Sequence, residues 1–233
     1  MRGSAILREL RQLTMLPLRR ETIYHLVFNP HGTEQPSLNR LIAVDPALAL
    51  AILRLVPRHF REGKLGIAQV ARFATPKILL DLVQQSSSSM GLDAPVASTE
   101  LEQLWTHSIA VAHAARHLSR SRHYDHPQTA YLAGLLHNTG LLAIAHVVPE
   151  AVSELLGQTE PPTGWLVAEH ERFGNTHTNI ANQLAKRWSL PQWLHEVLWW
   201  HHQADESLPP NLSDLALVEL VREADSLVAQ SEF

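Results

Sequence analysis

Residues that many proteins use for covalent cross-links or for binding polyanions are missing or scarce in this sequence. Cysteine is absent from all 233 residues, which excludes disulfide bonds and metal sites built on thiolates. A basic excess is also lacking, because 23 acidic side chains outnumber 19 basic ones and the formal net charge is -4. Binding the phosphates of a nucleic acid favours a basic surface, so nucleic acid is not an expected partner.

Long apolar runs and alternating apolar patterns are lacking too. The first residues, "MRGSAILREL", contain no run long enough for a signal peptide, and no segment reaches the roughly 18 apolar residues of a membrane span. Apolar residues instead recur three and four positions apart, which is typical of helices that bury one face. We therefore expect an all-α protein in the cytoplasm, without a membrane partner.

One polar stretch divides the predicted helices into two groups. Residues 84–99, "QQSSSSMGLDAPVAST", have the composition of a helix end followed by a linker. Among the patterns before it is "VDPALALAILRL", in which Asp45 is placed to cap a helix that starts at Pro46. We predict an amino-terminal helical lobe in residues 1–95 and a helical bundle in residues 96–233, packed against each other.

Histidine is abundant, with 15 copies, and several histidines lie on separate predicted helices of the second lobe. Helices of a bundle can each direct one side chain to a shared centre, where neutral imidazoles and carboxylates bind divalent metals. The candidate residues for such a centre, one amide included, are His107, His137, Asn138, His177, His201, His202 and Asp225.

Each candidate also has a simpler explanation, which the residues alone leave open. His137 and Asn138 interrupt an apolar run, and a buried polar pair satisfied by the backbone would explain them. His201 and His202 stand at a predicted helix end, where the helix dipole favours a protonated imidazole. A solvated helix face would explain Asp225.

Several motifs, in order, resemble those of a known family. They are "LIAVDPALALAILRL", "LWTHSIAVAHAARHLSR", "TAYLAGLLHNTGLL" and "EHERFGNTHTNIANQLAKRWSLPQWLHEVLWWHH". Together they resemble the HDOD domain, a divergent relative of the HD phosphohydrolases and of the HD-GYP cyclic-di-GMP phosphodiesterases. The resemblance extends over residues 10–205, with a weaker match at "VREADSLVA", and it implies a two-lobed helical bundle of the HD type.

The resemblance also implies a set of metal ligands. His107 matches the first His ligand of the parent family, and His137 matches the His of its His-Asp pair. His177 and His201 or His202 match further ligands of the HD-GYP branch. With Asp225 as the closing Asp, the implied metal site, for Mn, Fe or Mg, consists of His107, His137, His177, His202 and Asp225.

Departures from the catalytic pattern count against hydrolysis. Asn138 replaces the Asp of the pair, and an amide gives a divalent ion no charge compensation. Its amide can instead donate to one imidazole and accept from another, which suits a core without metal. Leu141 stands where the catalytic motif "HDIGK" has Lys, and no GYP element follows His202. We therefore expect no bound cofactor and a vestigial site.

The resemblance implies a non-catalytic signalling or regulatory module. We expect it to bind another signalling protein or a nucleotide second messenger, through the degenerate site or through a cleft between the lobes that the "LLHNTG" segment lines. The alternative is a metal-dependent phosphohydrolase or cyclic-dinucleotide phosphodiesterase, in which a metal-bound water is the nucleophile. Trp193, Trp199 and Trp200 mark a further candidate interface, although burial in the core explains them equally well.

Overall fold

The structure of the protein is a computed structural model that describes residues 2–29, 34–90, 99–149, 152, 162–203 and 207–231. Within these ranges every regular element is a helix, and no strand occurs. The predicted all-α fold is therefore confirmed.

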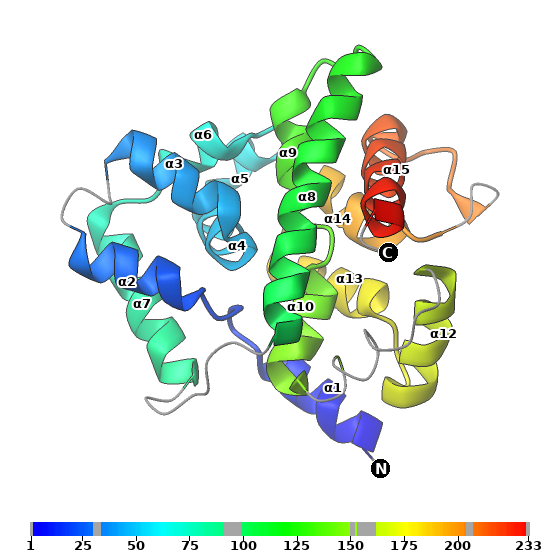
Figure 1. Ribbon diagram of the computed structural model, residues 1–233, viewed down its shortest axis with the longest axis horizontal. Helices are drawn as coiled ribbons and strands as arrows, with labels where there is room; N and C mark the ends of the chain where they lie inside the picture. The colour runs from blue at the N-terminus through cyan, green and yellow to red at the C-terminus, as the bar shows by residue number, and fades with distance from the viewer. Residues whose placement is uncertain are drawn as a thin grey trace.

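The first half of the chain consists mostly of short helices (Figure 1). They are α1 (Arg2–Gln12), α2 (Arg20–Phe28), α3 (Gln35–Val44), α4 (Pro46–Leu55), α5 (Arg58–Arg61), α6 (Ile67–Ala71) and α7 (Pro76–Met90). The start of α4 follows from local sequence, because the side chain of Asp45 accepts the backbone N–H of Leu48 at 3.0 Å and Pro46 occupies the first turn. This cap satisfies an N–H that has no partner within the helix, as predicted.

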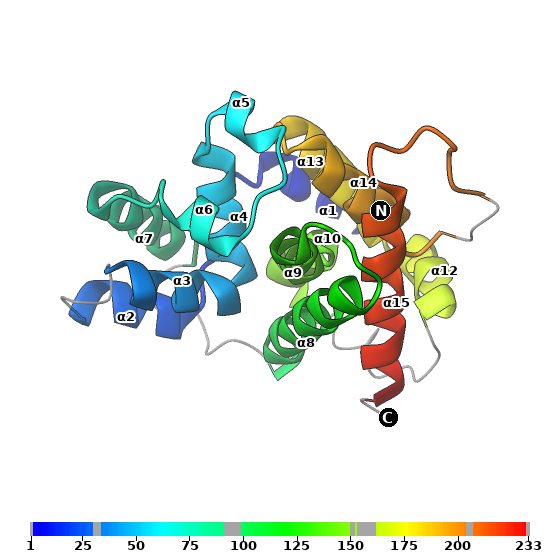
Figure 2. The ribbon, with the colours of Figure 1, turned by 90° about the horizontal axis from the view of Figure 1, so that it is seen from above.

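The second half contains the longest helix and the centre of the bundle. Its helices are α8 (Thr99–Ser121), α9 (Pro127–Leu136), α10 (Thr139–Val147), α12 (Pro162–Phe173), α13 (His177–Arg187), α14 (Gln192–Trp200) and α15 (Leu215–Ser231). Helix α9 packs along α8, and α15 packs against both (Figure 2). Helices α10, α13 and α14 form a second packed group, in which α13 contacts both α10 and α14.

The polar stretch predicted as a linker is helical in its first part. Residues 84–90 complete α7. Ser86 is buried, and its Oγ accepts the backbone N–H of Leu18 at 2.9 Å. A serine fits inside a helix when such a partner satisfies its hydroxyl. The predicted lobe boundary at residue 95 lies outside the described residues, so that boundary stays a prediction.

The two halves of the chain share one apolar core. Helices α3, α4 and α6 pack against α9, and the fully buried side chains include Leu48 and Leu53 on α4 and Leu132 and Leu136 on α9. Helix α1 packs mainly with the second half, against α10 and α12 (Figure 1). The chain therefore forms one packed body in which α1 crosses to the second half.

The most apolar segment lies at the centre of this body. Residues 127–147 are long and apolar enough to cross a membrane by length and composition, contrary to our expectation, but 89 % of that window is buried. The segment is therefore a core element of a helical domain. His137 and Asn138 interrupt it as the turn between α9 and α10, so the apolar run forms two helices.

Candidate metal centre

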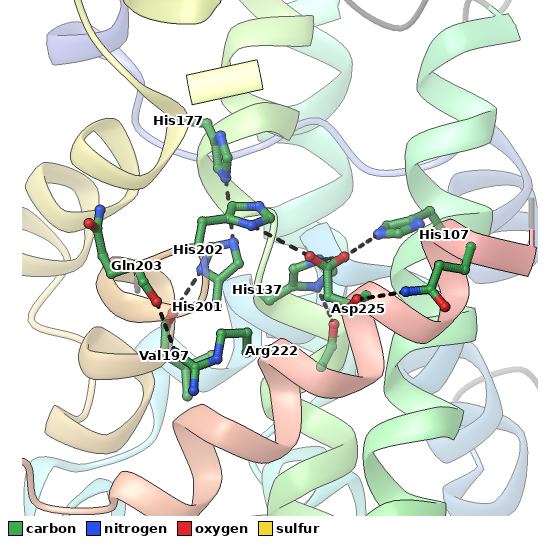
Figure 3. A network of polar contacts seen from close by, with 12 residues as sticks. His107, His137, His177, Val197, His201, His202, Gln203, Arg222 and Asp225 are labelled. Atoms are coloured by element: carbon green, nitrogen blue, oxygen red, sulfur yellow. Dashed lines mark hydrogen bonds and ion pairs between the residues drawn. The ribbon is translucent and has the colours of Figure 1, made fainter. Parts of the chain in front are cut away.

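Six of the predicted site residues meet in the second half of the chain, and we call them the His–Asp cluster (Figure 3). Helix α8 carries one of them, the α9–α10 turn another, the start of α13 a third, the end of α14 two more and α15 the last. Their ligand atoms form two groups, each within 4.8 Å: the first is His107, His137 and Asp225, and the second is His177, His201 and His202.

The carboxylate of Asp225 belongs to the first group and also approaches the second. Its Oδ1 is 2.8 Å from His107 Nε2 and 3.3 Å from His137 Nε2, and its Oδ2 is 3.7 Å from His202 Nδ1. The side chain of His107 is 14 % exposed, that of His202 9 % and that of Asp225 6 %. The cluster is therefore an almost closed polar centre with an edge at His107.

A hydrogen bond beside the cluster holds α15 in place. Arg222, one turn before Asp225, donates to the backbone carbonyl of Gln203 at 2.9 Å (Figure 3). This contact ties α15 to the residues that follow His202.

Hydrogen bonds to the backbone fix the orientation of two imidazoles. Nδ1 of His137 donates to the carbonyl of Gly134 at 2.7 Å, and Nδ1 of His201 donates to the carbonyl of Val197 at 2.9 Å. Because a carbonyl can only accept, each neutral ring carries its proton on Nδ1 and a lone pair on Nε2. Histidines that bind metals are commonly held in this way.

The orientation of a third imidazole is fixed by Glu169, which sequence analysis did not identify. One carboxylate oxygen lies 2.7 Å from His177 Nδ1, and the other accepts the backbone N–H of His177 at 2.7 Å. Both side chains are fully buried. The carboxylate holds the Nδ1 proton and leaves Nε2 facing the cluster. The segment "EHERFGNTH" contains two glutamates, and no sequence signal separates them. The structure shows that Glu169 is buried and that Glu171 is exposed.

The Nε2 atoms of these rings point toward one another. His177 Nε2 and His201 Nε2 are 3.4 Å apart, and two lone pairs at this distance repel unless a proton or cation lies between them. His137 Nε2 is buried and makes no hydrogen bond within the described residues, although Asp225 Oδ1 is 3.3 Å away. Imidazole lone pairs and a carboxylate that share one centre are a donor set that fits a divalent metal ion.

Burial keeps part of the cluster in the protonation state that metal binding requires. It lowers the pKa of His202 to about 3 and the pKa of His201 well below its usual range, and neighbouring imidazoles add to both effects. Burial raises the pKa of Asp225, but the hydrogen bond with His107 brings that pKa well below its usual range. The imidazoles of His201 and His202 are therefore neutral and the carboxylate of Asp225 is ionised at neutral pH, so a protonated imidazole at a helix end is not the explanation for His201 or His202.

Two glycines allow the helices around these ligands to approach closely. A Cβ on Gly140 would lie 2.0 Å from the carbonyl oxygen of His177, so α10 contacts the start of α13 directly. A Cβ on Gly134 would lie 2.9 Å from the Cα of Ala112 on α8. Only glycine fits at such approaches. The two contacts place His137 between α8 and α13.

Comparison with known families agrees with this architecture. Residues 13–204 match the family model described as the HDOD domain. The chain belongs to the HDOD domain family. The match includes both halves of the chain and ends before α15, so Asp225 comes from outside the matched residues. The family and the HD-like helical fold predicted from the motifs are confirmed.

Relatives of this HDOD domain share its sequence or fold over most of its length. An uncharacterised protein of Treponema pallidum (strain Nichols) is 27 % identical over an alignment of 221 residues, and the match covers 89 % of this chain and 42 % of that protein. The chain thus spans less than half of this relative. The response regulator MmoQ of Methylococcus capsulatus str. Bath has a TM-score of 0.68 and 21 % identity, over 92 % of this chain and 86 % of its own. A virulence factor of Campylobacter jejuni subsp. jejuni has a TM-score of 0.66 and 17 % identity, over 98 % and 84 %.

The two residues that depart from the catalytic pattern lie in the core of this HDOD domain. Asn138 is 3 % exposed, and its Oδ1 has no hydrogen-bond partner within the described part of the chain. This differs from our expectation that the amide accepts a hydrogen bond from an imidazole. Leu141 is fully buried among apolar side chains, so an apolar group occupies the position of the catalytic Lys.

The other predicted surfaces of this HDOD domain differ in their exposure. Trp193 is buried in the core, whereas Trp199 and Trp200 are half-buried and line a cavity of about 360 Å³. The use of these two tryptophans as an interface stays a prediction. A larger cavity of about 470 Å³ lies between the two halves of the chain. Its lining comes from α4, α5 and α7, from the residues that follow α1, and from the end of α13 and the residues after it. The "LLHNTG" segment does not line this cavity, contrary to our expectation.

Proposed function

We propose that this HDOD domain is a regulatory binding module whose His–Asp cluster holds a divalent transition-metal ion and does not hydrolyse phosphoesters. Its partner is another signalling protein or a nucleotide second messenger. One observation carries the metal-binding part: hydrogen bonds at Nδ1 of His137, His177 and His201 turn three Nε2 lone pairs toward a centre shared with Asp225.

The ligand chemistry favours iron over magnesium among the ions considered above. Imidazole nitrogen suits iron, whereas magnesium prefers oxygen ligands and retains much of its water. The cluster offers imidazoles from five histidines and one carboxylate. A bound ion would supply the positive charge that the Asp225 carboxylate and the facing lone pairs lack, and would hold α8, α13, α14 and α15 together.

Several features support a role without hydrolysis. Asn138 supplies no negative charge to bridge two ions, and Leu141 supplies no cation to face a phosphate. His107 is the most exposed ligand at 14 %, so a phosphoester has little access to the centre. The response-regulator relative is consistent with a signalling role, although its likeness shows the fold alone.

Elemental analysis of the untagged protein tests the metal site. We expect about one transition-metal ion per chain in the wild type, and loss of most of it in His137→Ala, because structural ligands bind metal as part of the fold. His117→Ala is a matched control, since His117 is an exposed histidine on α8. A wild type that is free of metal and binds no added ferrous ion would contradict the proposal.

A metal-dependent phosphohydrolase or cyclic-dinucleotide phosphodiesterase is the second candidate, because both three-ligand groups of a binuclear centre are present. We expect no turnover of cyclic dinucleotides or common nucleotides near the rate of about one per second that is ordinary for enzymes. Assays with iron, manganese and magnesium decide between the two. Turnover that disappears in His137→Ala and persists in His117→Ala would establish the second candidate.

A further inference from the structure

The cavity of about 470 Å³ between the two halves of the chain is lined by a cationic wall and by several apolar side chains. Arg54 at the end of α4, Arg61 at the end of α5 and Arg187 at the end of α13 form the cationic wall. Figure 2 shows α4 and α5 between α7 and the second half of the chain, where α13 lies. Three cations from three helices therefore meet at one opening.

Arg54 and Arg187 are held close to each other by Trp188. Their guanidinium carbons lie 4.4 and 5.5 Å from the centroid of the Trp188 ring. Burial and the charge of Arg187 lower the pKa of Arg54 to about 10. Like charges this close in a partly buried site repel each other, and an anion between them would remove this repulsion.

Arg61 brings unused hydrogen-bond donors to the same opening. Its Nη1 donates to the carbonyl of Ser189 at 2.8 Å, which turns the guanidinium across the gap between the two halves. Its Nε is buried and has no hydrogen-bond partner within the described residues. A buried charged donor without an acceptor is costly, so this wall lacks an anionic acceptor.

The chain itself supplies little negative charge here. Asp81 is the acidic residue in the cavity lining, and it pairs with Lys77 at 2.8 Å. The lining also includes the apolar side chains of Met15, Leu55 and Ile78, of which Leu55 is 48 % exposed. The cavity thus combines a net positive charge with apolar side chains.

We propose that this cavity binds an organic phosphate of the size of a mononucleotide. Arg54 and Arg61 bind the phosphate, and Met15, Leu55 and Ile78 contact the remainder of the molecule. Guanidinium groups match phosphate oxygens through paired hydrogen bonds, and the cavity volume lies in the range of about 300–1,000 Å³ that small-molecule sites occupy. The inference rests on the proposed role as a binding module and names its ligand class and site.

Arg187 contributes charge, but it also has a structural role. Its guanidinium donates to the carbonyls of Leu10, Arg11 and Leu13 at the end of α1, where a cation is favoured by the helix dipole. Its replacement would release α1, so Arg187 is not a suitable test variant. Arg54 and Arg61 lie on the first half of the chain and Arg187 on the second, so a phosphate bound in the cavity would lie between cations of both halves.

Calorimetric titration of the full chain with AMP, GMP and inorganic phosphate tests the site. We expect at least one nucleotide to bind with a Kd below about 1 mM, and Arg61→Gln and Arg54→Gln each to weaken it by about tenfold or more. Arg58→Gln is the matched control, because Arg58 begins the helix that Arg61 ends, pairs with Glu62 and has a side chain 87 % exposed. It should change the Kd by less than about twofold.

Each other outcome overturns the inference. The first is failure of both nucleotides to bind. The second is a loss of nucleotide affinity in Arg58→Gln as large as in Arg54→Gln or Arg61→Gln. The third is inorganic phosphate that binds as tightly as the nucleotides. If Arg54→Gln unfolds, Arg61→Gln decides alone. Titration in EDTA distinguishes binding in this cavity from binding at a metal ion in the His–Asp cluster. Nucleotide binding that is lost in EDTA depends on a metal ion, and this result would also overturn the inference. The metal content of the protein is measured independently, so failure here leaves the proposed metal-binding role standing.

Discussion

The substitution Glu169→Gln removes the charge that orients His177 and keeps the volume of the side chain. In the wild type the carboxylate accepts both the backbone N–H and the Nδ1 proton of His177, each at 2.7 Å, and both side chains are fully buried. Gln has one acceptor oxygen for these two donors, and its NH₂ group faces the other donor. A buried donor without a partner costs about 1–3 kcal/mol, so we expect the free energy of unfolding of the metal-free protein to fall by about 2 kcal/mol.

The same substitution should weaken metal binding. Loss of the partner of a ligating histidine commonly lowers metal affinity by about 10–100-fold, because the ring is no longer held with Nε2 toward the ion. Chelator competition measures the affinity, and urea unfolding followed by fluorescence of the 6 tryptophans measures the stability. Glu171→Gln, an exposed change on the same helix, should alter neither. Wild-type affinity in Glu169→Gln would refute the argument that Glu169 orients His177.

Three further outcomes follow from the same contacts. Asn138→Asp should destabilise the metal-free protein by about 1–3 kcal/mol, because residue 138 is 3 % exposed with an unpaired oxygen, and should strengthen divalent-ion binding; equal thermal melts with and without manganese would disprove this. Gly140→Ala should cost about 3 kcal/mol in urea unfolding, because its Cβ would lie 2.0 Å from the His177 oxygen, whereas Gly63→Ala, with 3.5 Å to its nearest neighbour, should cost less than a third of this. The melting temperature of the metal-free protein should fall as the pH falls from about 6.5 toward 3, because His202 binds a proton in this range only in the unfolded chain. The same dependence of melting temperature on pH in His202→Gln would contradict this.

Local patterns were sufficient for most of the helices. Spacings of three and four report burial of one helix face, and the cap by Asp45 depends only on Leu48, three positions away. The polar stretch shows where local composition fails. Ser86 favours a linker by its residue type, but it lies in a helix because Leu18, 68 positions away, satisfies its hydroxyl.

The sequence by itself determined the family, the helical class and the residue types of the His–Asp cluster, because ordered motifs and periodic burial are local properties. Only the tertiary structure decided which of those residues meet. His107 and Asp225 are 118 positions apart and their side-chain atoms are 2.8 Å apart. Glu169 is buried and bonded to His177, whereas Glu171, two positions later, is exposed. The cationic cavity at Arg61 has no motif at all, because its walls come from segments that are separate in the chain and become neighbours only when the two halves pack around one core.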